Sequence, residues 1–177
     1  HETNNMFNGC TNLTKIIMPK GTFDKIINCP GMFQNCTSLT EIDLSGFHIP
    51  NAQDISYMFS GCVLIEEIDC SALGVLNPTN INHMFVSCQN LKRVNLSGIK
   101  VPKSMSFSHM FYDSAVVEWI DISNIIARAS DVTNFWRSGT VVNDIGMLYC
   151  PANVINAFTK NMVNSGRTCN IYYHDAK

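Results

Sequence analysis

The residues of this sequence best suited to chemistry are its eight cysteines, because four of them recur at a fixed interval. Cys10, Cys36, Cys62 and Cys88 lie 26 residues apart, and Ser114 takes the next position in the series. In a repeating structure such residues form one row, where thiols could pair as disulfides or bind zinc. Parallel side chains would hold the Cβ atoms wider than a disulfide prefers, and the serine indicates that a small side chain suffices. We therefore expect buried, reduced thiols that pack as small apolar groups.

Two further sets of residues offer weaker sites. Cys150 and Cys169 flank a predicted helix, and a disulfide between them stays open as an alternative. His83 and His109 each precede a methionine and should lie side by side. Two imidazoles could hold a metal, but two ligands rarely suffice, so a solvated row is favoured. Since no C-x-x-C motif is present either, the sequence predicts no metal and no cofactor.

Acidic residues form another row at the same interval, made of Asp43, Asp69, Asn95 and Asp121. Carboxylates about 5 Å apart would repel one another, and a bound calcium ion could relieve that repulsion. Asn95 interrupts the row, however, and the sequence has no Asp-x-Asp-x-Asp-Gly loop. A solvated polar face is therefore the favoured interpretation.

Composition and motifs exclude several classes of function. The sequence has no G-x-S-x-G, H-E-x-x-H or Gly-rich phosphate loop, so we predict that the protein is not an enzyme. A net charge of −2 without a basic run argues against nucleic acid and anionic membrane surfaces as partners. No stretch approaches 18 apolar residues, so membrane insertion is not expected.

These rows belong to a repeat that dominates the sequence. Met-Phe pairs begin at residues 6, 32, 58, 84 and 110, and a fixed period of this size predicts a solenoid. Ten and twelve residues after each Met stand apolar residues, and from the second copy on a polar residue separates them, which is typical of a strand. The Met-Phe-x-x-Cys segment is expected to form one short helical turn with its Met, Phe and Cys inside.

The predicted fold class is α/β: a leucine-rich-repeat solenoid of about six 26-residue coils with a parallel sheet on one face. The solenoid is expected to cover residues 1–148. A C-terminal cap over residues 149–177 should add a helix beginning at Pro151 and a last strand near Ile171. Both parts are expected to form one continuous domain.

The phrase Met-Phe-x-x-Cys-x-x-Leu-x-x-Ile-Asp-Leu-Ser, found at residues 32–45, resembles the repeats of BspA-like leucine-rich-repeat surface proteins. The segment from Leu148 to Phe158 is similar to the terminal cap of that family. The Asn that other leucine-rich repeats carry after the strand is replaced here by Phe47, Leu73 and Ile99. The resemblance implies a cell-surface or secreted protein that adheres to a protein or glycan on another cell or matrix.

The predicted binding surface is the concave face of the sheet, where the strand residues that point away from the core are exposed. Trp119 is a large aromatic residue where the other repeats carry charge, and Trp and Arg dominate binding hot spots. We predict a patch of Trp119 beside Arg93, with Asp121 near. The complete predicted surface comprises Trp119, Arg93, Asp121, Asn95, Glu67, Asp69, Glu41 and Asp43. Alternatively, Trp119 packs against Trp136 or the tail and seals the core.

Two alternatives concern function and assembly. The chain could be a structural spacer or an intracellular scaffold with no dedicated ligand. The strand at residues 15–18 should form an edge of the sheet, which Lys15, Pro19 and Lys20 would help to protect. We expect this edge either to be covered by preceding sequence or to cause self-association.

Overall fold

The computed structural model describes residues 3–101, 105, 107–114, 116–125, 145–151 and 169–174. Within them the chain is strand-rich and contains no helix. The strands are β1 (Lys15–Ile17), β2 (Gly21–Thr22), β3 (Glu41–Asp43), β4 (Phe47–His48), β5 (Glu67–Asp69), β6 (Arg93–Asn95), β7 (Trp119–Asp121), β8 (Ile145–Pro151) and β9 (Cys169–His174). The structure places Pro151, the predicted first residue of the C-terminal helix, at the end of β8, and the rest of that predicted helix lies outside the described residues. No described segment is a helix long and apolar enough to cross a membrane.

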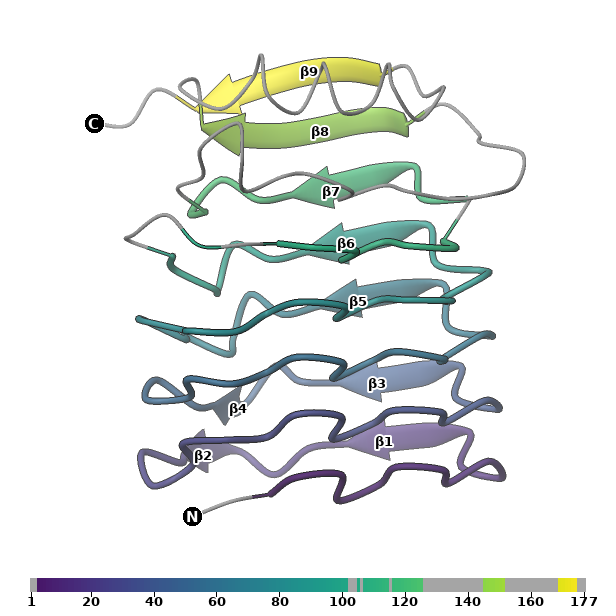
Figure 1. Ribbon diagram of the computed structural model, residues 1–177, viewed down its shortest axis with the longest axis vertical. Coiled ribbons are helices and arrows are strands. Elements are labelled where there is room, and N and C mark those ends of the chain that lie inside the picture. Colours follow the sequence, from purple (N-terminus) through teal and green to yellow (C-terminus); the bar gives the residue numbers. More distant parts are fainter. Residues whose placement is uncertain are drawn as a thin grey trace.

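β1, β3 and β5 to β9 lie one above another, and β2 and β4 form a short second column beside β1 and β3 (Figure 1). Within each sheet the paired strands are parallel. β1 pairs with β3, β2 pairs with β4, and β5 to β9 form one five-stranded sheet. Each pairing among β1 to β7 joins residues one repeat apart, as Glu67 with Arg93 and Arg93 with Trp119. The predicted parallel arrangement of the strands is therefore confirmed for the described repeats.

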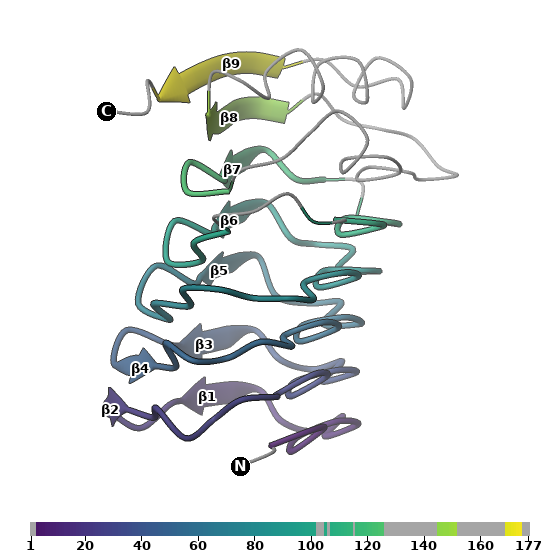
Figure 2. The same ribbon diagram turned by 60° about the vertical axis from the view of Figure 1, so that its left-hand side comes forward.

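The Met-Phe segments form tight turns instead of the predicted helical turns. The residue before each Met and the residue three places after it have positive φ, as Gly31 (59°) and Asn35 (57°) do around Met32. A left-handed residue on each side leaves too few right-handed residues to propagate a helix. Figure 2 shows these turns as a column on the side of the stack opposite the strands.

Backbone hydrogen bonds link the turns from one repeat to the next. The N–H of Phe33 donates to the carbonyl of Met58 at 2.9 Å, and Phe59 donates to Met84 at 3.0 Å. The equivalent bonds of Phe7 and Phe85 measure 2.8 and 2.9 Å. The polar groups of these buried turns are thus satisfied by the neighbouring repeat, without a helix or a sheet.

The predicted apolar rows form one continuous core. The phenylalanines that follow the methionines stack through the described repeats, with ring centroids 5.1–5.7 Å apart. In the middle of the stack, the strand rows are buried at Ile68, Val94 and Ile120. The first two repeats are looser, because Leu13 and Ile42 are partly buried.

The sheet is interrupted between β3 and β5, which are neighbours in the stack but belong to different sheets (Figure 1). Glu41 and Asp43 on β3 occupy the same row positions as Glu67 and Asp69 on β5. Like charges at facing positions of neighbouring strands are destabilising. Elsewhere the first of these rows alternates in sign, as in the ion pair of Lys15 with Glu41 at 2.6 Å.

At the first described repeat, β1 has a strand partner on one side only within the described residues. Ile17, the last residue of β1, is 66% exposed. Self-association through β1 stays a prediction.

Candidate functional site

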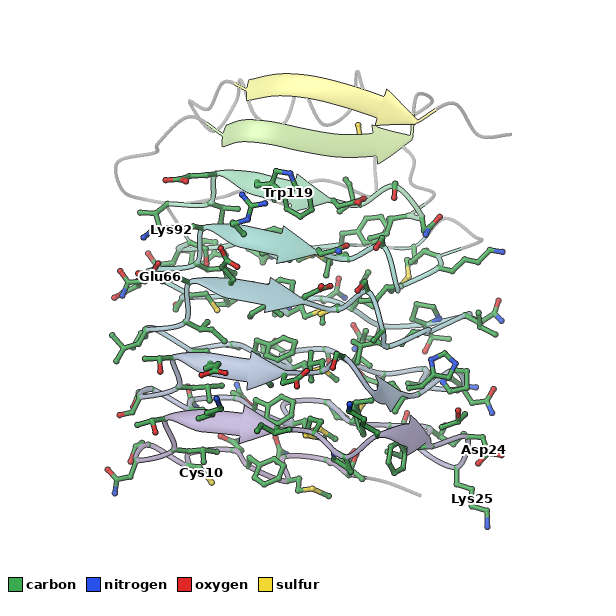
Figure 3. All side chains as sticks on the ribbon, turned by 180° about the vertical axis from the view of Figure 1, so that it is seen from behind. Cys10, Asp24, Lys25, Glu66, Lys92 and Trp119 are labelled. Atoms are coloured by element: carbon green, nitrogen blue, oxygen red, sulfur yellow. The ribbon has the colours of Figure 1, made fainter. Side chains whose placement is uncertain are left out.

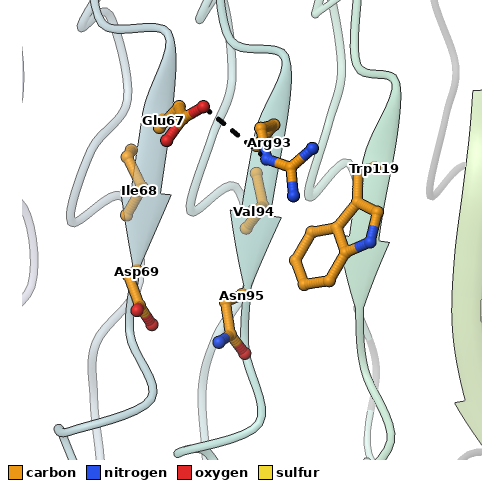
Figure 4. Close-up of a pocket in the computed structure, with 7 residues that line it drawn as sticks. All are labelled: Glu67, Ile68, Asp69, Arg93, Val94, Asn95 and Trp119. Atoms are coloured by element: carbon orange, nitrogen blue, oxygen red, sulfur yellow. Dashed lines mark ion pairs between the residues drawn. The ribbon is translucent and has the colours of Figure 1, made fainter.

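An open pocket of about 210 Å³ lies on the outward face of β5, β6 and β7. Glu67, Arg93 and Trp119 stand along one side of it, and Asp69 and Asn95 stand at the other end of the strands (Figure 4). Ile68 and Val94 complete the lining. Five of the eight residues predicted for binding therefore meet at one pocket.

Strand alternation and register position these side chains. Ile68 and Val94 point inward and are 2% and 0% exposed, so their strands contribute mainly backbone to the pocket floor. Their neighbours along each strand point outward. The parallel register sets Glu67 beside Arg93 and Arg93 beside Trp119. Figure 3 shows Trp119 on this face of β7.

Arg93 is held between two neighbours in the pocket. Its Nε lies 3.6 Å from a carboxylate oxygen of Glu67, and its guanidinium carbon lies 5.0 Å from the ring centroid of Trp119. This is a cation–π contact together with a long ion pair. The side chain of Arg93 is still 52% exposed, so it can contact a ligand while both neighbours orient it.

The row of Asp and Asn residues has a structural role that the sequence interpretation missed. In the four repeats that carry it, the side-chain oxygen of this residue accepts a hydrogen bond from the backbone N–H of the serine two residues later. The distances are 2.9, 2.8, 3.0 and 2.9 Å for Asp43, Asp69, Asn95 and Asp121. These are Asx turns, which end the strands. At Asp43, the hydrogen bonds from Ser45 lower the carboxyl pKa.

Because Asn can replace Asp in an Asx turn, the charge repulsion between β3 and β5 can be tested without disturbing the end of the strand. Asp69→Asn retains the turn, as Asn95 does naturally, but removes one of two like charges on neighbouring strands. We expect the free energy of unfolding to rise by up to about 1 kcal/mol, and by less in high salt. Urea unfolding at low and high salt measures both effects.

Asp121→Asn is the matched control, because its strand neighbour on β6 is the uncharged Asn95. This variant should leave stability almost unchanged. The proposed repulsion between Asp43 and Asp69 would be contradicted if Asp69→Asn lowered the free energy of unfolding. It would also be contradicted if both variants raised that free energy equally.

The remaining predicted residues lie outside the pocket. Glu41 forms its ion pair with Lys15 on β1, Asp43 lies on β3 across the interruption, and Asp121 caps the end of β7. A second ion pair, between Lys92 and Glu66 at 2.9 Å, lies beside the starts of the strands (Figure 3). The pocket-lining Ile68 and Val94 were not predicted, because their side chains belong to the core.

The buried thiols of the cysteine row do more than pack. Cys36, Cys62 and Cys88 are buried as predicted, whereas Cys10 in the first repeat is exposed, contrary to the prediction. Each buried thiol donates to a phenylalanine carbonyl of the preceding repeat, as Cys62 does to Phe33 at 3.2 Å. Burial raises the pKa of Cys62 to about 12, so it stays a protonated, unreactive thiol at neutral pH.

The two C-terminal cysteines are not cross-strand neighbours. In the register of β8 with β9, Cys150 lies opposite Tyr173, and Cys169 lies opposite Ile145. The register therefore gives no support to a disulfide between them.

The histidines stack as expected but are not a simple solvated row. The rings of His83 and His109 are 5.2 Å apart and nearly parallel, and Tyr57 stacks on the other side of His83 at 4.7 Å. Within the described residues, Nδ1 of His83 is buried without a hydrogen-bond partner. No group of three or more His, Cys, Asp or Glu residues in the described part could hold a metal.

The histidine stack predicts a loss of stability on acidification. Burial, with the nearby His109 as the second cause, lowers the pKa of His83. The unfolded chain then takes up this proton at higher pH than the folded chain, so stability falls as the pH drops below about 6.5. The urea midpoint should decrease from about pH 7 to about pH 5. His83→Asn should make the urea midpoint depend less on pH. Asparagine suits this backbone position, since Asn5 occupies the equivalent left-handed position. An unchanged pH dependence would contradict the role of His83.

Comparison with known proteins identifies a family but no function. No curated protein and no solved structure matches the sequence. The resemblance to BspA-like surface proteins is therefore not confirmed. Residues 1–125 match the family described as "Mycoplasma protein of unknown function, DUF285". Because this match covers more than half of the chain, the protein belongs to that family.

Proposed function

We propose that the chain is a non-catalytic recognition module that binds another macromolecule, a protein or a glycan, through the outward face of β5 to β7. In this proposal the whole domain is a leucine-rich-repeat solenoid of about six coils with a C-terminal helix–strand cap. It acts at the cell surface or in secreted form. The observation that carries the proposal is Trp119, an indole that lines an open polar pocket at a row position where the described repeats otherwise carry charge.

The physical argument for binding is that an aromatic side chain is held on a rigid framework. Tryptophan and arginine concentrate binding energy because they join a large contact area with polar groups. Trp119 and Arg93 project from paired strands, and Arg93 is further oriented by Glu67. Side chains that are already ordered lose little conformational entropy when a ligand binds.

The alternative is a spacer or intracellular scaffold without a dedicated ligand. The outward polar rows favour the spacer or scaffold. The Asx turns and the ion pairs of Lys15 and Lys92 give these outward residues a role within the fold, so they need no ligand to explain them. Those contacts explain the charged rows. They do not explain a pocket with a tryptophan in its lining.

The test is binding of the full chain to surfaces coated with fibronectin, laminin, collagen or mucin. We expect at least one coat to retain the wild-type protein at micromolar concentration. Trp119→Ala should weaken this binding at least about 10-fold, as for a hot-spot residue. Lys100→Ala, which changes an exposed residue outside the pocket, should bind as the wild type does.

Melting temperatures separate recognition from core packing. Loss of binding by Trp119→Ala with an unchanged melting temperature supports the proposal. If the melting temperature falls by several degrees while binding persists, Trp119 seals the core instead. Failure of every coat to retain the wild type at micromolar concentration would favour the spacer.

A further inference from the structure

The polar atoms of the pocket form a mixed set of hydrogen-bond donors and acceptors. Oδ1 of Asp69 accepts from the backbone of Ser71, and its second carboxylate oxygen has no hydrogen-bond partner within the described residues. Oδ1 of Asn95 accepts from both the N–H and the hydroxyl of Ser97. These bonds fix the orientation of the Asn95 amide, so its NH₂ group is left as a donor.

Arg93 and Glu67 add further hydrogen-bond donors and acceptors to the pocket. The guanidinium of Arg93 offers N–H donors beyond the Nε that faces Glu67. Glu67 is 72% exposed and offers carboxylate oxygens as acceptors. The pocket thus presents donors and acceptors side by side, next to the apolar surface of Trp119.

The charged groups of the pocket further restrict the kinds of ligand that it can bind. The two carboxylates, Glu67 and Asp69, outnumber the one guanidinium and disfavour an anionic ligand. Arg93, which stands between Glu67 and Trp119, disfavours a cationic one. A hydroxyl group both donates and accepts, so adjacent hydroxyls satisfy such a mixed set better than an ammonium or a phosphate does. The C–H faces of a hydroxylated ring can also contact an indole.

We infer that the pocket binds a neutral saccharide ring, so that the ligand of the module is a glycan. This inference rests on the proposed recognition function and specifies its ligand. The volume of about 210 Å³ is below the roughly 300–1,000 Å³ of pockets for drug-sized molecules. It suits one ring of a longer chain, with the remainder lying along the sheet.

The test compares coats of the same glycoproteins before and after mild periodate oxidation. Periodate cleaves the vicinal diols of sugars and leaves the polypeptide in place. We expect binding that depends on Trp119 to be lost after oxidation, and to be inhibited by soluble galactose, mannose, fucose or N-acetylglucosamine. Heparin and oligolysine, as anionic and cationic probes, should not inhibit it.

A matched pair of variants tests the donor in the pocket. Asn95→Asp keeps the Asx-turn acceptor, as Asp69 does, but removes the amide donor. It should weaken binding about 10-fold without unfolding the protein, as checked by the melting temperature. Asn12→Asp makes the same change at an exposed residue of the first repeat, away from the pocket, and should leave binding unchanged.

The outcomes separate this inference from the proposed function. Binding that depends on Trp119 but survives periodate means a protein ligand, which overturns the inference and leaves the recognition function standing. Inhibition by heparin alone means an anionic glycan and overturns the neutral ligand. If no coat binds in a Trp119-dependent way, the recognition function itself fails. Wild-type binding by Asn95→Asp contradicts the assigned donor.

Discussion

Replacing Phe85 by alanine should lower the free energy of unfolding by about 3–5 kcal/mol. Phe85 is 0% exposed, and its ring lies between those of Phe59 at 5.7 Å and Phe111 at 5.1 Å. Removing the ring leaves a cavity between two repeats and breaks both stacking contacts. The backbone turns around it are hydrogen-bonded to the neighbouring repeat, so they cannot easily collapse into the space.

Phe7→Ala is the natural control for this variant. Phe7 belongs to the same row, but it is partly buried and stacks on one described ring, that of Phe33 at 5.5 Å. Urea unfolding should show a clearly smaller cost for Phe7→Ala than for Phe85→Ala. Equal costs, or a cost below about 1 kcal/mol for Phe85→Ala, would mean that the ring row does not carry the stability of the stack.

Ser114→Ala should cost about 1–3 kcal/mol, because it leaves buried polar groups without partners. The Ser114 hydroxyl donates to the carbonyl of Phe85 at 2.6 Å and accepts from the N–H of Cys88 at 3.1 Å. Ser114 is fully buried, so water cannot replace these bonds unless the repeats separate. Ser114→Ala should therefore weaken the contact between two neighbouring repeats.

Ser114→Cys distinguishes hydrogen bonding from packing. A thiol keeps the donor to Phe85, just as Cys88 donates to the carbonyl of Phe59 at 3.1 Å. This variant should be more stable than Ser114→Ala in urea unfolding. If alanine proves as stable as serine, the row needs only a small side chain, and its hydrogen bonds contribute nothing measurable.

Much of the fold could be predicted because one period controls it. The spacing of the Met-Phe pairs implies that equivalent residues meet, and the pairing of Arg93 with Trp119 follows directly from it. Apolar rows such as Ile68 and Val94 had to point inward, since no single repeat could bury them alone. The same alternation placed Arg93, Asn95 and Trp119 on one outward face, where the pocket lies.

The features that could not be predicted depend on backbone dihedrals and single hydrogen bonds. The left-handed residues around Met32 turned an expected helical turn into a tight turn. Ser114 was interpreted as a small filler, although its hydroxyl makes the same kind of bond to a preceding carbonyl as Cys62 does. The spacing of Asp69 and Ser71 is a signal for an Asx turn, but a row of acidic residues is equally compatible with a solvated face or a cation site.

The common register also has a genetic consequence. The strand ladder, the stacked rings and the thiol bonds all join residues about one repeat apart. In-frame gain or loss of one complete repeat in the gene therefore lengthens or shortens the stack by one layer and recreates the same kinds of junction. A deletion that does not remove a whole number of repeats would place polar residues on apolar rows. Recombination between repeats can thus change the reach of the protein while each remaining layer keeps its packing.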